Sequence, residues 1–184
     1  FHSDCARILR FEAGSLGYPS SFTIYDQTDA VRLTNYILKD MNIDSKRYPP
    51  RGIHAQISKA KNEMINPKTY RASAETILEE KVADVYEEYQ IRLQKSAAMD
   101  FDDLLFKTVE MFASFPEILD RYQQRFKHVL VDEYQDTNPV QNQLVIQLGA
   151  ESRNVCVVGD QDQSIYAFRS ADIRNIIDFE NNFP

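Results

Sequence analysis

Four acceptor-rich side chains lie within five positions, in the stretch VDEYQDTN that directly follows an apolar run. They are Asp132, Glu133, Gln135 and Asp136. A carboxylate at the end of a buried strand can hold Mg²⁺, often through water, while a neighbouring carboxylate orients an attacking water. That division of labour is typical of a nucleoside triphosphatase. An Asp-Glu pair ending a strand is also a common solvated turn, and the dipeptide alone favours this simpler interpretation.

A second polar cluster follows another short apolar run, in the stretch VGDQDQSIYAFRSA from Val158 to Ala171. It combines carboxylates and amides with Tyr166, Phe168 and Arg169. Aromatic rings beside an arginine in a polar loop suit stacking on nucleic-acid bases. Two aromatics at this spacing are more often core residues, but a buried pair is less expected directly after a carboxylate-rich strand end.

The elements that must position these clusters read strand–helix–strand–helix from residue 128 onward. Strands are expected at 128–132 and 155–158, and the helix between them begins at Asn138-Pro139 and ends at Gly149. Asp172 is expected to cap a final helix. The alternation predicts a parallel sheet wrapped by helices, in which ligands gather at the carboxyl ends of the strands.

Residues 26–98 are predicted to contain helices only, and a short helix is expected near the start of the chain, before Gly14, Gly17 and Pro19 end it. The expected helices are a short one carrying Cys5, Ile8 and Leu9 on one face, an amphipathic one from Asp26, one from Ile53 to Met64 after a loop at Pro49, Pro50 and Gly52, and a long one over 73–94. Two more are expected at 101–113 and 116–126. We therefore expect an α/β domain interrupted by an all-helical insertion at 26–98.

Composition sets limits on the class of protein. The 184 residues are 43% apolar with a net charge of −7, which favours a folded domain and argues against a uniformly basic nucleic-acid binder. Cys5 and Cys156 fit neither a zinc site nor a disulfide framework, so we expect reduced core thiols of a cytosolic protein. No apolar run approaches the roughly 18–20 residues that span a bilayer, so no membrane partner is expected. The two ends, Phe1-His2-Ser3 and Phe183-Pro184, look cut from a longer protein.

One segment departs from the acidic balance of the chain. The stretch from Lys46 to Arg71 contains seven basic residues and a single acidic one, Glu63. The basic residues are Lys46, Arg47, Arg51, Lys59, Lys61, Lys68 and Arg71. Such a stretch suits contacts with nucleic-acid phosphates, and it is equally typical of a solvated basic face.

Four stretches resemble consecutive motifs of the UvrD/PcrA/Rep-type superfamily 1 DNA helicases, in the same order: FHSDCARILR, MDFDDLL, VDEYQDTN and VGDQDQSIYAFRSA. The resemblance is close over residues 1–10 and 99–171, and between 26 and 95 it lies in position and helical character. It implies a partial RecA-like (P-loop NTPase) parallel sheet built from 1–25 and 99–184, with a helical insertion subdomain at 26–98.

The resemblance also implies roles for single residues. Asp132 would coordinate the Mg²⁺ of bound ATP, Glu133 would be the general base, and Gln163 would sense the γ-phosphate. The implied DNA-binding residues are Phe1 and His2 at a strand end, Tyr166 and Phe168 as stacking aromatics, and Arg169 as support for their loop or the DNA backbone. Asp100 and Asp103 belong to a family motif but can equally cap a helix.

The implied function is that of an ATP-dependent DNA helicase moving 3′→5′ on single-stranded DNA, in the cytoplasm. Single strands and single-strand/duplex junctions would be its partners, with accessory repair or replication proteins beside them. Two alternatives stay open: the motor portion of a helicase–nuclease, and a noncatalytic DNA-binding or docking module that retains the fold.

The phosphate-binding signature GxxxxGK[ST] is absent from the sequence, because none of the five glycines precedes a lysine. In the family this loop lies upstream of Phe1, and a second RecA-like domain with an arginine finger lies downstream of Pro184. We therefore expect the 184 residues alone to be inactive as an ATPase.

Overall fold

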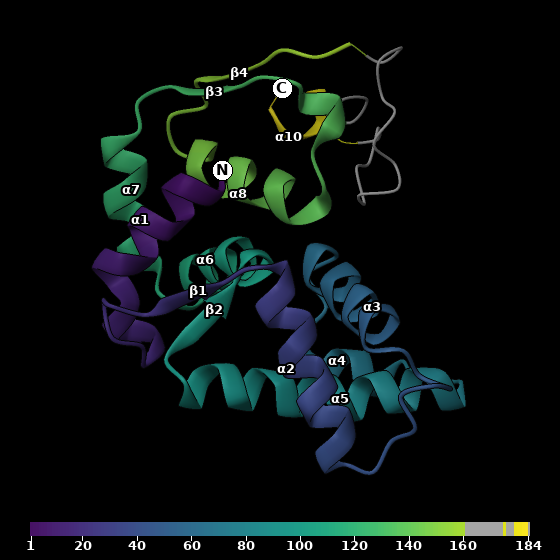
Figure 1. Ribbon diagram of the computed structural model, residues 1–184. Coiled ribbons are helices and arrows are strands. Elements are labelled where there is room, and N and C mark those ends of the chain that lie inside the picture. Colours follow the sequence, from purple (N-terminus) through teal and green to yellow (C-terminus); the bar gives the residue numbers. More distant parts are fainter. Residues whose placement is uncertain (161–174, 176–178, 184) are drawn as a thin grey trace. The chain divides into compact units, whose positions relative to one another are not determined.

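The computed structural model of the protein describes residues 1–160, 175 and 179–183 (Figure 1). The chain divides into two compact units, His2–Leu104 and Phe1 with Leu105–Pro184. The two units are defined by compactness alone, and the insertion at 26–98 stays a prediction. Within the described residues, no helix is long and apolar enough to cross a membrane.

The unit His2–Leu104 is mostly helical and contains one small sheet. Its elements are α1 (His2–Glu12), η1 (Ala13–Leu16), β1 (Thr23–Tyr25), α2 (Gln27–Asp40), α3 (Pro50–Asn62), α4 (Pro67–Ala72), α5 (Ile77–Lys95), β2 (Ala98–Asp100) and the start of α6 (Phe101–Ser114). β1 and β2 pair in parallel, with Thr23 opposite Ala98 and Tyr25 opposite Asp100. Neither strand was predicted, because three residues are too few to show an alternating pattern.

Side-chain caps explain where these helices begin. The Asp26 carboxylate accepts a hydrogen bond from the Asp29 amide at 2.9 Å, as the predicted start of α2 requires. Thr76 and Glu79 form a capping box at α5, so this helix begins at Ile77 rather than near residue 73. The predicted loop at Pro50 was wrong: α3 begins there, because proline at the first helical position lacks only an amide that has no helical partner.

The core of this unit lies between α2, α3 and α5, which contact one another; in Figure 1, α2 crosses in front of α5. Its buried members are Ala30, Ile37, Leu38, Ile53, Ile57, Ala60, Val82, Val85, Tyr86, Tyr89, Leu93 and Ala98. The predicted apolar face of α1 is also buried, at Cys5, Ile8 and Leu9.

The other unit contains the predicted strand–helix–strand arrangement. Its elements are the rest of α6, then α7 (Pro116–Arg125), β3 (Val129–Val131), η2 (Tyr134–Asp136), α8 (Pro139–Gly149), β4 (Val155–Val157) and α10 (Phe179–Asn182). β3 and β4 pair in parallel, with Val129 opposite Val155 and Val131 opposite Val157. Helix α8 connects them, and Asn138 caps it together with Gln141. The α/β class is therefore confirmed, with small parallel sheets, while the final helix predicted at Asp172 lies outside the described residues.

Alternation along β4 corrects one expectation about the cysteines. Cys5 is buried as predicted, but Cys156 is exposed. Successive side chains of a strand point to opposite faces, and Val131 faces the core with Tyr134 and Val145. Cys156 is paired with Leu130, which is 76% exposed, so both lie on the other face of the sheet.

Candidate active site

The carboxyl ends of β3 and β4 are held side by side by backbone hydrogen bonds. The Val158 amide donates to the Val131 carbonyl at 2.8 Å, and the Tyr134 amide donates to the Val158 carbonyl at 2.9 Å. Asp132 directly follows β3, and Asp160 follows β4 by three residues. The structure thus brings the first polar cluster next to the beginning of the second, as parallel pairing predicts.

The two adjacent carboxylates are both exposed. Oδ1 of Asp132 accepts a hydrogen bond from the Glu133 amide at 3.0 Å. Glu133 itself has a left-handed backbone, with φ 51° and ψ 45°. This conformation costs a residue with a side chain about 1–3 kcal/mol, and such strain gathers at functional sites. Here it lies at the step from β3 to η2, where both carboxylates are exposed.

Gln135 lies beneath this turn and is 1% exposed. Its side-chain Nε2 donates to Oε2 of Glu133 at 2.7 Å. Its Oε1 accepts a hydrogen bond from the backbone amide of Asp160 at 3.0 Å. One buried amide therefore joins the candidate base at the end of β3 to the loop after β4.

The rest of the loop is anchored to the helix that follows. Tyr134 is fully buried, its hydroxyl donates to Asn142 of α8, and burial raises its pKa to about 12. The Thr137 hydroxyl donates to the Tyr134 carbonyl at 2.7 Å, and Asn175 donates to the Thr137 carbonyl at 2.9 Å. These contacts hold the backbone that carries the carboxylates.

A magnesium ion fits the donor set here. Mg²⁺ is usually bound by one or two carboxylates, several waters and substrate phosphates, rather than by a cage of protein ligands. The exposed Asp132 supplies such a carboxylate, and the exposed Glu133 beside it stays available as the candidate base. Among residues 1–160, 175 and 179–183, no group of three or more His, Cys, Asp or Glu side chains is placed to hold a metal ion.

The remaining predicted site residues fall into two groups. Phe1 is 36% exposed, and His2 begins α1 with its ring edge against Phe101, at 6.1 Å between ring centroids. Burial lowers the pKa of His2. Gln163, Tyr166, Phe168 and Arg169 lie outside the described residues, so their roles stay predictions.

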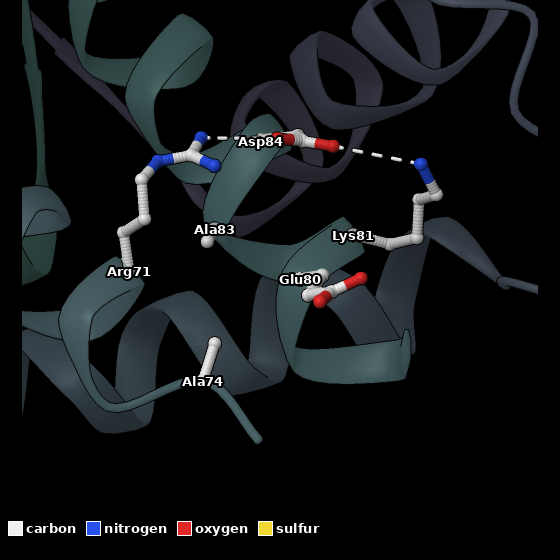
Figure 2. A pocket seen from close by; sticks show the side chains of 6 residues that line it. All are labelled: Arg71, Ala74, Glu80, Lys81, Ala83 and Asp84. Atoms are coloured by element: carbon white, nitrogen blue, oxygen red, sulfur yellow. Dashed lines mark hydrogen bonds and ion pairs between the residues drawn. The ribbon is translucent and has the colours of Figure 1, made fainter. Parts of the chain in front are cut away.

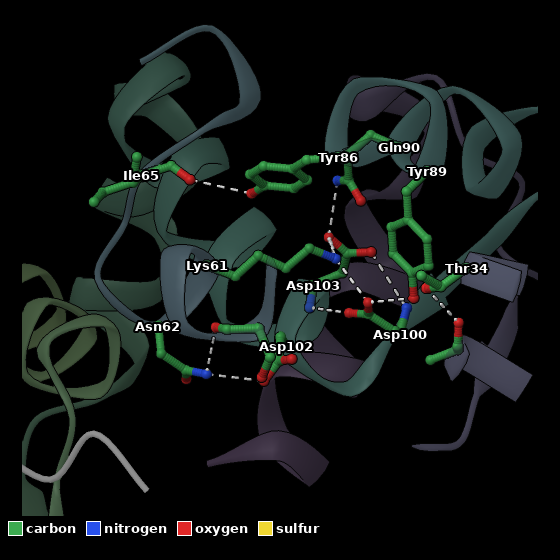
Figure 3. Close-up of polar contacts among 12 residues, drawn as sticks. Thr34, Lys61, Asn62, Ile65, Tyr86, Tyr89, Gln90, Asp100, Asp102 and Asp103 are labelled. Carbon is green, nitrogen blue, oxygen red and sulfur yellow. Dashed lines mark hydrogen bonds and ion pairs between the residues drawn. The ribbon is translucent and has the colours of Figure 1, made fainter. Parts of the chain in front are cut away.

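A separate buried cluster, at Lys61, Asp100 and Asp103, was not foreseen (Figure 3). Nζ of Lys61 lies 2.7 Å from Oδ2 of Asp100 and 3.0 Å from Oδ1 of Asp103. All three side chains are buried. Lys61 therefore cannot contact nucleic-acid phosphates. Its interpretation as one of the surface cations of the basic stretch was wrong.

The two acids of this cluster also cap a helix. The Asp103 amide donates to Oδ1 of Asp100 at 2.8 Å, and the Asp100 amide donates to Oδ2 of Asp103 at 3.3 Å. This reciprocal pair is a capping box at the start of α6, which confirms the helix-capping interpretation. Helix capping was one of the two interpretations of these acids, but nothing in the sequence indicated the distant lysine.

Neutral side chains complete the lysine cluster. The Tyr89 hydroxyl donates to Oδ2 of Asp100 at 2.9 Å, and Nε2 of Gln90 donates to Oδ1 of Asp103 at 3.0 Å. Burial alone lowers the pKa of Lys61, but the charges of Asp100 and Asp103 outweigh it and hold the pKa above its usual value. Burial, with Asp100 next, raises the pKa of Tyr89, so its hydroxyl stays a donor.

Other members of the basic stretch do lie at the surface. Lys46, Arg47, Arg51, Lys59 and Lys68 are exposed. Arg71 lies beside a hollow of about 260 Å³ between α4 and α5 (Figure 2), where it contacts Asp84 at 3.0 Å and Glu87 at 3.2 Å. Because acids already neutralise Arg71, this hollow is not a candidate phosphate site.

An exposed Asp-Glu pair at the joined ends of parallel strands defines a candidate nucleoside-triphosphate hydrolysis site in an α/β protein. The UvrD/REP helicase N-terminal domain family matches the chain over residues 1–184, and the chain belongs to this family. The predicted relation to UvrD/PcrA-type helicases is thus confirmed.

Curated relatives agree over the whole chain. It is 46% identical to the "ATP-dependent DNA helicase PcrA" of Bacillus subtilis and 44% identical to that of Leuconostoc citreum. It is 46% identical to the protein of the same name from Staphylococcus aureus. In each case all 184 residues align, and they cover 25% of the relative. The chain therefore spans about a quarter of the length of these relatives.

Proposed function

We propose that this chain is part of the motor of an ATP-dependent DNA helicase that moves 3′→5′ on single-stranded DNA and unwinds duplexes. Membership of the UvrD/REP family and the name shared by its relatives support an ATP-driven DNA function. The observation that carries the proposal is the exposed Glu133 carboxylate, held by Gln135 at the joined ends of β3 and β4.

The residues at these strand ends divide the work of hydrolysis. Asp132 would hold the magnesium ion, directly or through water, and the ion would supply positive charge beside the phosphates of ATP. Glu133 accepts a proton from the attacking water. As the water oxygen bonds to the γ-phosphorus, the bond from phosphorus to the bridging oxygen of ADP breaks. ADP and phosphate leave, and the proton on Glu133 returns to solvent.

The framework we propose is a RecA-like domain formed by 1–25 and 99–184, with the insertion at 26–98. Gln163 would sense the γ-phosphate beside the strand ends. Tyr166 and Phe168 would stack on bases of the single strand, Arg169 would support their loop, and Phe1 and His2 would contact the same strand. The segment then works within a longer cytoplasmic helicase that engages single-strand/duplex junctions, with accessory repair or replication proteins as partners.

The test replaces Glu133 with glutamine in the full-length protein. The amide preserves size but cannot accept the proton, so DNA-stimulated ATP turnover should fall by at least about 100-fold. Binding of a fluorescent ATP analogue should stay within about threefold, because the general base is not needed for affinity. Glu151→Gln, an exposed acid of the same unit, is the matched control and should keep normal turnover. Turnover of the Glu133→Gln protein within tenfold of wild type would reject the assignment.

A further inference from the structure

The side chain of Gln135 makes two hydrogen bonds from one buried position, one as donor and one as acceptor. Nε2 donates to Oε2 of Glu133 at 2.7 Å, and Oε1 accepts from the Asp160 amide at 3.0 Å. Gln135 is 1% exposed, whereas Glu133 is exposed. A buried amide therefore orients a surface carboxylate, which would otherwise sample several rotamers.

We propose that Gln135 is a positioning residue that aims the Glu133 carboxylate and links it to the loop after β4. This inference rests on the proposed function, because it assigns Glu133 the role of base. The Gln135 amide uses one acceptor site of Oε2, and the remaining acceptor sites of the Glu133 carboxylate are left for the proton from water.

The second hydrogen bond gives Gln135 a second role. Asp160 lies three residues after the end of β4, and Gln163 follows it by three positions in the sequence. A displacement of the Asp160 backbone would pull on the Gln135 side chain and so on the carboxylate of Glu133. The same side chain thereby makes the aim of the base depend on the position of the loop after β4.

Two substitutions remove the hydrogen bond to Glu133, and they differ in whether the hydrogen bond from the Asp160 amide is kept. Gln135→Glu keeps an oxygen that can accept from the Asp160 amide, but it removes the donor to Glu133 and places a second carboxylate beside it. Gln135→Met keeps the length of the side chain and removes both bonds. Outer partners of this kind typically change activity by about 10-fold to 100-fold. We expect such a loss in kcat of DNA-stimulated ATP turnover for both variants, with KM for ATP within about threefold.

A double substitution distinguishes positioning from a purely structural role. If Gln135 acts through Glu133, Gln135→Met should have no further effect on residual turnover once Glu133→Gln is present. A structural role would lower turnover and nucleotide binding by the same factor in both backgrounds. Gln143→Met on α8, a half-buried glutamine outside the site, is the matched control.

The outcomes are distinct for the two proposals. All measurements use the full-length protein, with circular dichroism and binding of a fluorescent ATP analogue as checks of folding. If Glu133→Gln keeps turnover, the proposed function of this site fails. If Glu133→Gln abolishes turnover but Gln135→Glu and Gln135→Met keep kcat within threefold, only the positioning role fails. Should Gln135→Met not fold, the Gln135→Glu protein decides alone.

Discussion

Nζ of Lys61 lies 2.7 Å from Oδ2 of Asp100, although the two residues are 39 positions apart and both are buried. The pair joins α3 to the end of β2, and Asp103 in the first turn of α6 completes the cluster. Buried charges are tolerated only when they are paired and hydrogen-bonded, and here Tyr89 and Gln90 supply the additional bonds. The ion pair therefore ties part of the predicted insertion to the MDFDDLL motif.

Removing the lysine should destabilise the fold strongly. Lys61→Met leaves two buried carboxylates facing each other without a cation, at a cost of about 3–5 kcal/mol in the free energy of unfolding. Urea unfolding of the 184-residue chain, followed by circular dichroism, measures this loss. Lys59→Met, at an exposed position of the same helix, should change stability by less than about 0.5 kcal/mol.

The partners of the lysine allow a sharper check. Adding Asp100→Asn and Asp103→Asn to Lys61→Met removes the uncompensated charges and should restore a large part of the lost stability. A Lys61→Met protein as stable as the wild type would mean that the buried ion pair does not form.

His54 should make the same unit sensitive to acid. Its side chain is 3% exposed, its ring lies against Tyr89, and neither ring nitrogen has a hydrogen-bond partner within the described part of the chain. Burial is the main cause that lowers the pKa of His54, with Lys61 acting in the same direction and Asp100 opposing it. A lowered pKa means that the unfolded chain binds the proton more readily than the folded one.

Stability should therefore be highest above the unfolded-state pKa of about 6.5 and should fall as the pH drops through and below it. Urea unfolding between about pH 8 and pH 5 tests this. His54→Phe keeps a ring against Tyr89 but cannot titrate. It should flatten the dependence of stability on pH, so that the contribution of His2 remains. His128→Phe, at an exposed position, should leave the slope as it is in the wild type. A His54→Phe protein with the wild-type slope would contradict the assignment.

The local elements were largely predictable, because their signals lie in neighbouring residues. Asp26 and Asn138 carry caps, and apolar runs mark β3 and β4. Contacts between distant residues were not predictable. From the sequence, Lys61 looked like one of seven surface cations. Its burial beside Asp100 depends on tertiary structure and not on sequence neighbours.

At the candidate site the sequence predicted the residue types but not their geometry. Asp132 and Glu133 were expected at the strand end, and they are there. The left-handed backbone of Glu133 and the bond from Gln135 to Asp160 could not be foreseen, because both depend on how the β4 loop approaches the β3 loop. Family resemblance supplied the implied roles of these residues.

The burial of Lys61 changes which cations should bind DNA. Arg51 and Lys59 are exposed on α3, so Arg51→Glu with Lys59→Glu should weaken binding of the full-length protein to forked DNA. For every phosphate that the protein no longer neutralises, the slope of log affinity against log salt should become shallower by about 0.9. Lys39→Glu with Lys95→Glu, also exposed but outside the basic stretch, controls for net charge. Equal salt slopes for the two double variants would mean that Arg51 and Lys59 belong to a solvated basic face and do not bind DNA.

The loop after β4 is predicted to couple nucleotide to DNA, and its aromatics give the first test. Tyr166→Ala and Phe168→Ala should each cost about 1–3 kcal/mol of affinity for oligothymidine if a base stacks on each ring. Fluorescence anisotropy of a labelled oligonucleotide with the full-length protein measures this. Unaltered affinity for oligothymidine in both variants would mean that Tyr166 and Phe168 are core residues and do not stack on bases.

Gln163 should behave differently from the aromatics, because its predicted partner is the γ-phosphate rather than DNA. It lies three residues before Tyr166, so a shift at the phosphate can reach the stacking ring through little intervening chain. In Gln163→Ala the affinity for oligothymidine without nucleotide should survive, while its change on adding a nonhydrolysable ATP analogue should shrink. Coupling is reciprocal, so DNA should equally lose its effect on the affinity for the analogue. Gln124→Ala, an exposed glutamine of α7, is the control. A Gln163→Ala protein that keeps the full nucleotide-dependent change in DNA affinity would rule out the sensor role.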